Sequence, residues 1–95
     1  MDFDFNKKIW LDADKLKSKE SLYPYMKEIF EFPEYFGNNL DALNDCLSEV
    51  NEHTDILLTR QCVKEICENE YAFKVLIVLG EAANSNPYLH LLFRK

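Results

Sequence analysis

The stretch that decides the fold is residues 32–47, which read FPEYFGNNLDALNDCL. Its first part holds the proline and the glycine that are typical of a turn. From about Asn39 to Val50, large apolar residues recur every three or four positions, which predicts a helix with one apolar side. That side comprises Leu40, Leu43, Leu47 and Val50. The opposite side comprises Asp41, Asn44, Asp45, Ser48, Glu49 and Glu52.

Two residues could cap this helix. Asn38 and Asn39 both have side chains that accept a hydrogen bond from the first turn. If Asn38 is the cap, Asp41 occupies the third position of a pattern that resembles a capping box. Gly37, just before them, either supplies an unusual backbone angle or allows the backbone of a partner to approach.

Acidic residues are concentrated around the same helix. Residues 28–59 hold eight Asp and Glu and no Lys or Arg, while the rest of the chain holds nine acidic and eleven basic residues. The net charge of −6 therefore comes from one contiguous third of the sequence. Such a charge disfavours nucleic acids and anionic membranes as partners.

The remaining elements alternate between strands and helices. Ninety-five residues predict one domain, residues 1–95. Strands separated by helices imply a parallel sheet, so we expect an α/β fold with three parallel strands packed against about four helices. The expected strands are 7–11, 55–59 and 88–93, and the other expected helices are 18–30, 61–69 and 71–84. The helix at 71–84 is apolar almost all round, which predicts that it is largely buried.

We expect this protein to be cytoplasmic, because the chain shows neither a secretory signal nor a membrane-spanning run. Its N-terminus is acidic before it is basic and has no apolar run behind it, unlike a secretory signal. The longest apolar run, Val75–Leu79, is too short to span a bilayer. Three cysteines, Cys46, Cys62 and Cys67, are most simply free and partly buried thiols.

Residues 33–37, 39–43 and 45–47 closely resemble the signature of the barstar family, intracellular inhibitors of secreted ribonucleases. The resemblance implies a three-stranded parallel sheet with four helices. It also implies that the helix at 39–50 and its preceding loop bind the active site of a basic ribonuclease or ribonuclease toxin in a one-to-one complex. The contact residues that it implies are Tyr35, Gly37, Asn39, Asp41, Asn44 and Asp45, with Glu81 at the edge. The family usually has Trp where this chain has Asn44, and its well-studied member has another where Val50 stands.

The positions of Asp41 and Asp45 favour a binding role on physical grounds, independently of the resemblance. Asp41 and Asp45 are four residues apart and share one face of the helix, where like charges oppose each other. The stability of the fold does not demand this pair, whereas a partner with Arg, Lys and His in a phosphate-binding cleft would favour it. From the pattern alone, a solvated helix face is the alternative.

Two other functions remain open. A protein of this fold could bind a target other than a ribonuclease. A small metal-binding domain would use His53, His90, Cys62 or Cys67, although the two cysteines lack the usual spacing of a zinc knuckle. The chain shows neither a glycine-rich phosphate loop nor a grouped nucleophile and base, so we expect neither a cofactor nor an enzyme.

Overall fold

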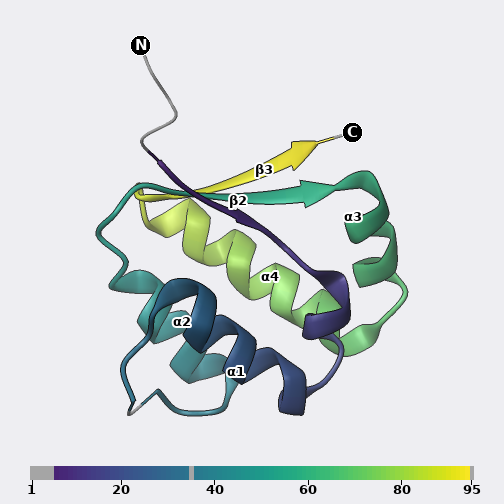
Figure 1. The fold of residues 1–95 in the computed structure, drawn as a ribbon, viewed down its shortest axis with the longest axis horizontal. Helices are drawn as coiled ribbons and strands as arrows, with labels where there is room; N and C mark the ends of the chain where they lie inside the picture. The colour runs from purple at the N-terminus through teal and green to yellow at the C-terminus, as the bar shows by residue number, and fades with distance from the viewer. Residues whose placement is uncertain (1–5, 35, 95) are drawn as a thin grey trace.

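A computed structural model describes residues 6–34 and 36–94 (Figure 1). Strands and helices alternate as the sequence predicts, with one addition, the short 3₁₀ helix η1. The elements in chain order are β1 (Lys7–Trp10), η1 (Ala13–Leu16), α1 (Lys19–Phe30), α2 (Leu40–Ser48), β2 (Thr54–Thr59), α3 (Arg60–Cys67), α4 (Glu70–Ser85) and β3 (Leu89–Arg94). The helix predicted at 39–50 is shorter than expected, since α2 ends at Ser48.

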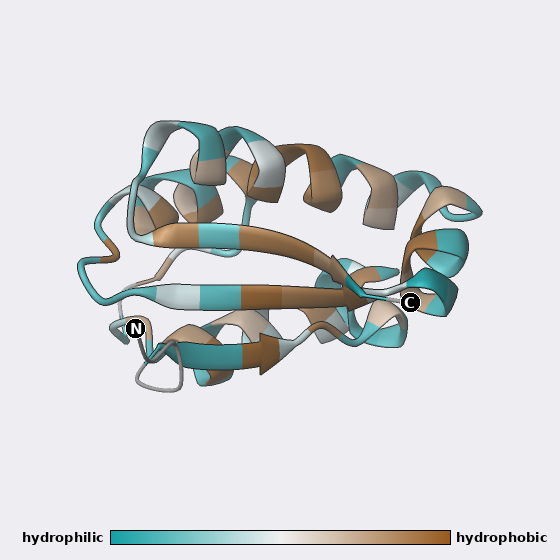
Figure 2. Ribbon diagram, turned by 90° about the horizontal axis from the view of Figure 1, so that it is seen from above, coloured by the Kyte–Doolittle hydropathy of each residue, from teal (hydrophilic) through white to brown (hydrophobic). Residues whose placement is uncertain are grey.

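The three strands form a parallel sheet in the order β1-β2-β3 (Figure 2). The amino end of β2 aligns with both neighbours, because Thr54 pairs with Lys7 and with Leu89. Helices α1, α2 and α4 lie on one side of the sheet, and α3 lies at the end where β2 stops (Figure 1). The predicted α/β fold, three parallel strands with four helices, is confirmed.

One buried cluster joins the helices to the sheet. Its side chains come from all four helices and from β2 and β3, and they exclude water from the space between the layers. The fully buried members include Leu22, Met26, Leu43, Leu47, Ile56, Leu58, Ile66, Val75 and Leu79. Within residues 6–34 and 36–94, no helix is long and apolar enough to cross a membrane.

The expectation that the late helix is largely buried is wrong for one of its sides. Phe73 and Ile77 of α4 are 46% and 47% exposed. Helix α4 packs against α2, α3 and β3 through the opposite side, where Val75 and Leu79 are buried. No other described element covers the outer side of α4, so its apolar residues there stay in solvent.

The three cysteines are predicted to be free and partly buried, and this is confirmed for two of them. All three are free thiols. Cys62 is buried and Cys46 is half-buried, but Cys67, at the end of α3, is exposed, so the expectation of a partly buried thiol is wrong there.

Helix α1 ends in a left-handed residue that is not glycine. Glu31 has φ 57° and ψ 44°, and Phe32 N–H donates to the Lys27 carbonyl at 3.0 Å. A side chain in this conformation costs about 1 kcal/mol, which glycine avoids. We therefore expect Glu31→Gly to melt about 4–8 °C above Glu31→Ala in a thermal unfolding experiment.

Glu31→Ala is the matched control for that comparison. Both changes remove the exposed ion pair between Glu31 and Lys7, which spans 3.2 Å. Only the change to glycine removes the energetic cost of a side chain in the left-handed backbone conformation. Equal melting temperatures for the two variants would show that the left-handed residue stores no strain.

A tyrosine pair joins α1 to α4 and makes stability depend on pH. Burial, together with a 2.6 Å hydrogen bond between the Tyr23 and Tyr71 hydroxyls, raises the pKa of Tyr23 well above its usual value of 10.0. The unfolded chain then loses a proton that the folded chain keeps, so stability is full below pH 10.0 and falls as pH rises beyond it.

We expect urea unfolding above about pH 10 to show this loss, with a slope of at most about 1.4 kcal/mol per pH unit from Tyr23. Tyr23→Phe removes the titrating hydroxyl and should unfold with a shallower dependence on pH. An identical slope in both proteins would exclude Tyr23 as the cause.

Candidate protein-binding surface

Helix α2 begins at a single cap. The side-chain oxygen of Asn39 accepts a hydrogen bond of 2.7 Å from Ala42 N–H, so Asn39, and not Asn38, is the N-cap. Asp41 is consequently the second helical residue rather than the third, and the capping-box alternative is excluded. In the first turn, the partial positive charge of the helix N-terminus favours the Asp41 carboxylate.

The two sides of α2 differ as predicted. Leu43 and Leu47 are fully buried, and Leu40 and Val50 pack partly against the same core. The exposed side of α2, called here the acidic face, consists of Asp41, Asn44, Asp45, Ser48 and Glu49. Burial of the leucines therefore fixes the direction in which these polar side chains point.

Asn86 holds the far end of α2. Its side-chain amide donates to the Leu47 carbonyl at 2.9 Å and to the Val50 carbonyl at 3.0 Å, and its oxygen accepts from Tyr88 N–H at 2.9 Å. The residue is only 7% exposed. Asn86 thereby gives a side-chain donor to one carbonyl in the last turn of α2 and to one just beyond it, and it links α2 to the segment between α4 and β3.

The acidic face carries charge that no ion pair among residues 6–34 and 36–94 neutralises. Six ion pairs occur among the described residues, and none involves this face. Three acids of the 28–59 stretch are neutralised by lysines from outside it, in the pairs Lys7–Glu31, Lys8–Asp55 and Lys27–Glu34. The acidity predicted for the whole stretch is thus concentrated on α2.

Cys46, on the border of the acidic face, responds to that charge. Burial, together with the negative charges of Glu49 and Asp45, raises the pKa of the Cys46 thiol. Its sulfur is therefore protonated at neutral pH and is a poor nucleophile and metal ligand.

A groove of about 540 Å³ runs beside the acidic face, between α2 and the end of α4. Asn44 lines it from α2 and Glu81 from α4, so the structure brings these two predicted residues together. Its other lining residues are Ser48, Ala82, Asn84, Ser85, Asn86 and Pro87. The polar residues 84–87 form the rim of this groove, a role that their sequence pattern, typical of a helix end, does not indicate.

The loop before α2 is anchored by aromatic rings. Phe36 is buried, with its ring centroid 5.0 Å from that of Phe32 and 5.9 Å from that of Tyr23. Tyr35, a predicted contact residue, lies outside the described residues. The loop is thus fixed on its core side by Phe32 and Phe36.

Gly37 has a different role from the first one expected. It does not have a positive φ, so the expected unusual backbone angle is not found. A Cβ atom added at Gly37 would lie 3.2 Å from the Cβ of Ala42, which is closer than side chains normally approach. Glycine therefore lets the loop pack closely on the first turn of α2, and approach by a partner's backbone stays a prediction.

The residues of the metal-binding alternative fall into two separate places. His53 and His90 meet at the amino end of the sheet, with His53 Nδ1 and His90 Nε2 3.1 Å apart. Their ring centroids are 5.3 Å apart and their planes differ by 10°. The distance between the ring centroids is close to the sum of the nitrogen–nitrogen distance and the two ring radii. The two rings therefore lie side by side in nearly the same plane, and a hydrogen bond joins their facing nitrogens.

Cys62 and Cys67 lie on α3, beyond the other end of β2. The Cys62 thiol donates to the Leu11 carbonyl at 3.4 Å, and burial raises its pKa. In the part of the chain that the structure describes, no three His, Cys, Asp or Glu residues are grouped to hold a metal ion.

The fold and the surface define a class of protein. A small parallel α/β scaffold presents one unneutralised acidic helix, an arrangement suited to holding a cationic partner. The family model described as Barstar (barnase inhibitor) matches residues 6–86. The chain is also 35% identical over 77 residues to "Putative ribonuclease inhibitor YrdF" of Bacillus subtilis (strain 168), covering 80% of this chain and 85% of that protein.

The chain belongs to the barstar family, and it is an inhibitor rather than an enzyme. The match to the family model includes α1, α2 and α4 but ends before β3.

Proposed function

We propose that this chain inhibits a cognate ribonuclease by covering its active site, in a one-to-one complex, with the acidic face and the loop before it. The observation that carries this proposal is that Asp41 and Asp45, on a rigidly mounted helix, have no ion pair among the described residues. The inhibitor would act in the cytoplasm, as an immunity protein against a ribonuclease toxin. Its relative's printed name, a ribonuclease inhibitor, supports the same role.

The chemistry of the target explains why carboxylates serve here. A ribonuclease binds RNA phosphates through Arg, Lys and His side chains in a cleft. Carboxylates of Asp41 and Asp45 can occupy the places of two phosphate groups and accept the same hydrogen bonds. Opposite charge on the two surfaces also raises the rate of encounter and makes that rate fall as salt is added.

The neighbouring polar residues would extend this contact. Asn39 uses its side-chain oxygen for the cap, which leaves its NH₂ group to donate to the partner. Asn44 and Glu81 line the groove, so a cationic side chain of the ribonuclease entering it would meet an amide and a carboxylate. Tyr35 and Gly37, in the loop, are proposed to contact the partner beside α2.

The proposal is tested by capturing the ribonuclease from extracts of the source cells. Immobilised wild-type protein should retain an activity that cleaves a fluorogenic RNA, and addition of free wild-type protein should abolish that cleavage. The double variant Asp41→Ala, Asp45→Ala should retain none. The control is Glu20→Ala, Glu28→Ala, which removes the same charge from exposed positions of α1 and should capture normally.

Two outcomes would reject the proposal. Full inhibition by the Asp41→Ala, Asp45→Ala variant would show that the acidic face is not the inhibitory surface. The second outcome is that wild-type protein captures a protein without ribonuclease activity and the double variant does not capture it. The acidic face would then be a binding surface, but for a target other than a ribonuclease.

A further inference from the structure

A second surface lies at the carboxyl end of the sheet, away from the acidic face. A pocket of about 580 Å³ opens there, lined by Leu58, Arg60, Val63, Phe93 and Arg94. It lies where β2 and β3 end and α3 begins, whereas α2 lies toward the other end of the molecule (Figure 1). Ligands of parallel α/β sheets commonly bind beyond the carboxyl ends of the strands.

The walls of this pocket, called here the carboxyl-end pocket, are apolar. Leu58 is fully buried and forms the inner wall, and Val63 lines it from α3. Phe93 is 64% exposed, the largest exposed fraction among the large apolar side chains of the described residues. A concave apolar surface with a few polar groups at its rim is typical of a binding site.

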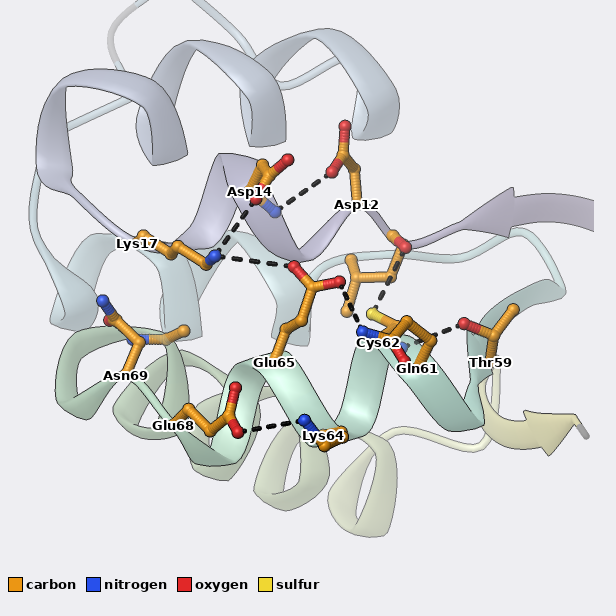
Figure 3. A network of polar contacts seen from close by, with 12 residues as sticks. Asp12, Asp14, Lys17, Thr59, Gln61, Cys62, Lys64, Glu65, Glu68 and Asn69 are labelled. Atoms are coloured by element: carbon orange, nitrogen blue, oxygen red, sulfur yellow. Dashed lines mark hydrogen bonds and ion pairs between the residues drawn. The ribbon is translucent and has the colours of Figure 1, made fainter.

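The rim is positively charged, and its charges are available. Arg60 and Arg94 are exposed, and neither takes part in an ion pair within residues 6–34 and 36–94. The acids on the adjoining helix α3 are already engaged (Figure 3). Glu65 binds Lys17 at 3.5 Å and Gln61 at 3.2 Å, and Glu68 binds Lys64 at 3.2 Å.

The neighbouring strand adds a feature that favours a peptide. β3 pairs with β2 and is the last strand on its side of the sheet. In a parallel pair, residues alternate between facing the neighbour and facing away. Because Tyr88 C=O accepts from Thr54 N–H, this alternation directs the backbone groups of Leu91 and Phe93 to the open edge. An extended peptide can bind such an edge through its own backbone.

We propose that the carboxyl-end pocket and the edge of β3 bind an extended acidic peptide segment of a second protein, with an apolar side chain in the pocket and carboxylates on Arg60 and Arg94. Charge complementarity selects an acidic segment. The open strand edge favours a peptide over RNA or a lipid surface, because only a peptide has the backbone N–H and C=O groups that pair with a strand. The site lies apart from the acidic face, so a partner can bind it while a ribonuclease occupies α2.

The test uses a fluorescein-labelled peptide that alternates Asp or Glu with Phe or Leu. Fluorescence anisotropy at low salt should show saturable binding to the whole chain. Arg60→Glu and Phe93→Ser should each weaken it by about tenfold. The control Lys74→Glu makes the same charge change at an exposed position of α4 outside the pocket, and it should change affinity by less than about twofold.

Amide hydrogen exchange followed by NMR supplies the second readout. The bound peptide should protect the N–H groups of Leu91 and Phe93, and circular dichroism should confirm that the variants are folded. Equal weakening by Lys74→Glu and Arg60→Glu would overturn the proposal, as would peptide binding without protection at Leu91 and Phe93.

Three further outcomes would also overturn it. One is binding that survives when the peptide's apolar residues become serine. Another is stronger Arg60-dependent binding of single-stranded RNA or of phosphatidylglycerol vesicles. The last is self-association of the chain that Phe93→Ser abolishes, seen by sedimentation, because the edge would then belong to a second copy. Neither readout involves a ribonuclease, so failure here leaves the proposed function untouched.

Discussion

Asp45→Ala is expected to weaken binding of the captured ribonuclease by about 2–5 kcal/mol, which is roughly 30-fold to several thousandfold in Kd. That energy range derives in part from barnase–barstar, a complex of this same family. The loss has two parts. The variant forgoes a hydrogen-bonded charge pair, and it leaves the partner's cation buried without a counter-charge. Stopped-flow binding should show that most of the change lies in the dissociation rate.

Asp45 should be the most sensitive single position. Asp41 lies in the first turn of α2, where the helix dipole already supports its carboxylate, whereas Asp45 lies one turn further and gains less from the helix. Removing Asp45 should therefore cost little fold stability, and its effect on binding can be measured cleanly.

The control for this prediction is Glu28→Ala. Glu28 is exposed on α1 and contributes the same charge to the overall field, but it lies outside the acidic face. It should lower the association rate slightly and leave dissociation unchanged. A loss in Glu28→Ala that equals the loss in Asp45→Ala would mean that net charge, rather than contact with α2, holds the ribonuclease.

Asn86→Ala is expected to lower the free energy of unfolding by about 2–4 kcal/mol. The change removes three hydrogen bonds and leaves the carbonyls of Leu47 and Val50 without this donor. At about 4–8 °C for each kcal/mol in a domain of this size, the melting temperature should fall by at least about 8 °C. Circular dichroism measures both quantities, the free energy of unfolding in a urea titration and the melting temperature in a thermal scan.

Two variants isolate the role of the amide. Asn84→Ala, exposed on the same groove, should cost less than about 0.5 kcal/mol. Asn86→Asp keeps the acceptor for Tyr88 N–H but turns an oxygen toward the two carbonyls, so it should be at least as destabilising as Asn86→Ala. Wild-type stability in Asn86→Asp would show that the contacts with Leu47 and Val50 contribute nothing.

Local patterns predicted most of the fold. The alternation of strands and helices gave the parallel sheet, and the spacing of Leu43 and Leu47 gave the buried side of α2. The same spacing placed Asp41 and Asp45 on the exposed side, since the side-chain direction on a helix follows directly from sequence position.

Other features depend on contacts between residues far apart in the sequence. Asp55 is buried at the sheet because Lys8 and Asn6 bind it, and a count of acids could not separate it from the exposed aspartates of α2. The groove is equally non-local, because Asn44 and Glu81 meet only when α2 packs on α4. The exposure of Phe73 depends on which side of α4 the other elements cover, which the helix's own composition does not specify.

The hydrogen bonds of Asn86 also determine when α2 acquires its final support during synthesis. Ribosomes add about 5–20 residues per second, and α2 leaves the ribosome well before the residue that holds its end. Until Asn86 and Tyr88 have emerged, the carbonyls of Leu47 and Val50 lack the Asn86 amide as a donor, and β3 cannot join the sheet. If α2 binds a ribonuclease as proposed, an incomplete chain presents that helix without its final support, so inhibition would require synthesis to proceed through β3.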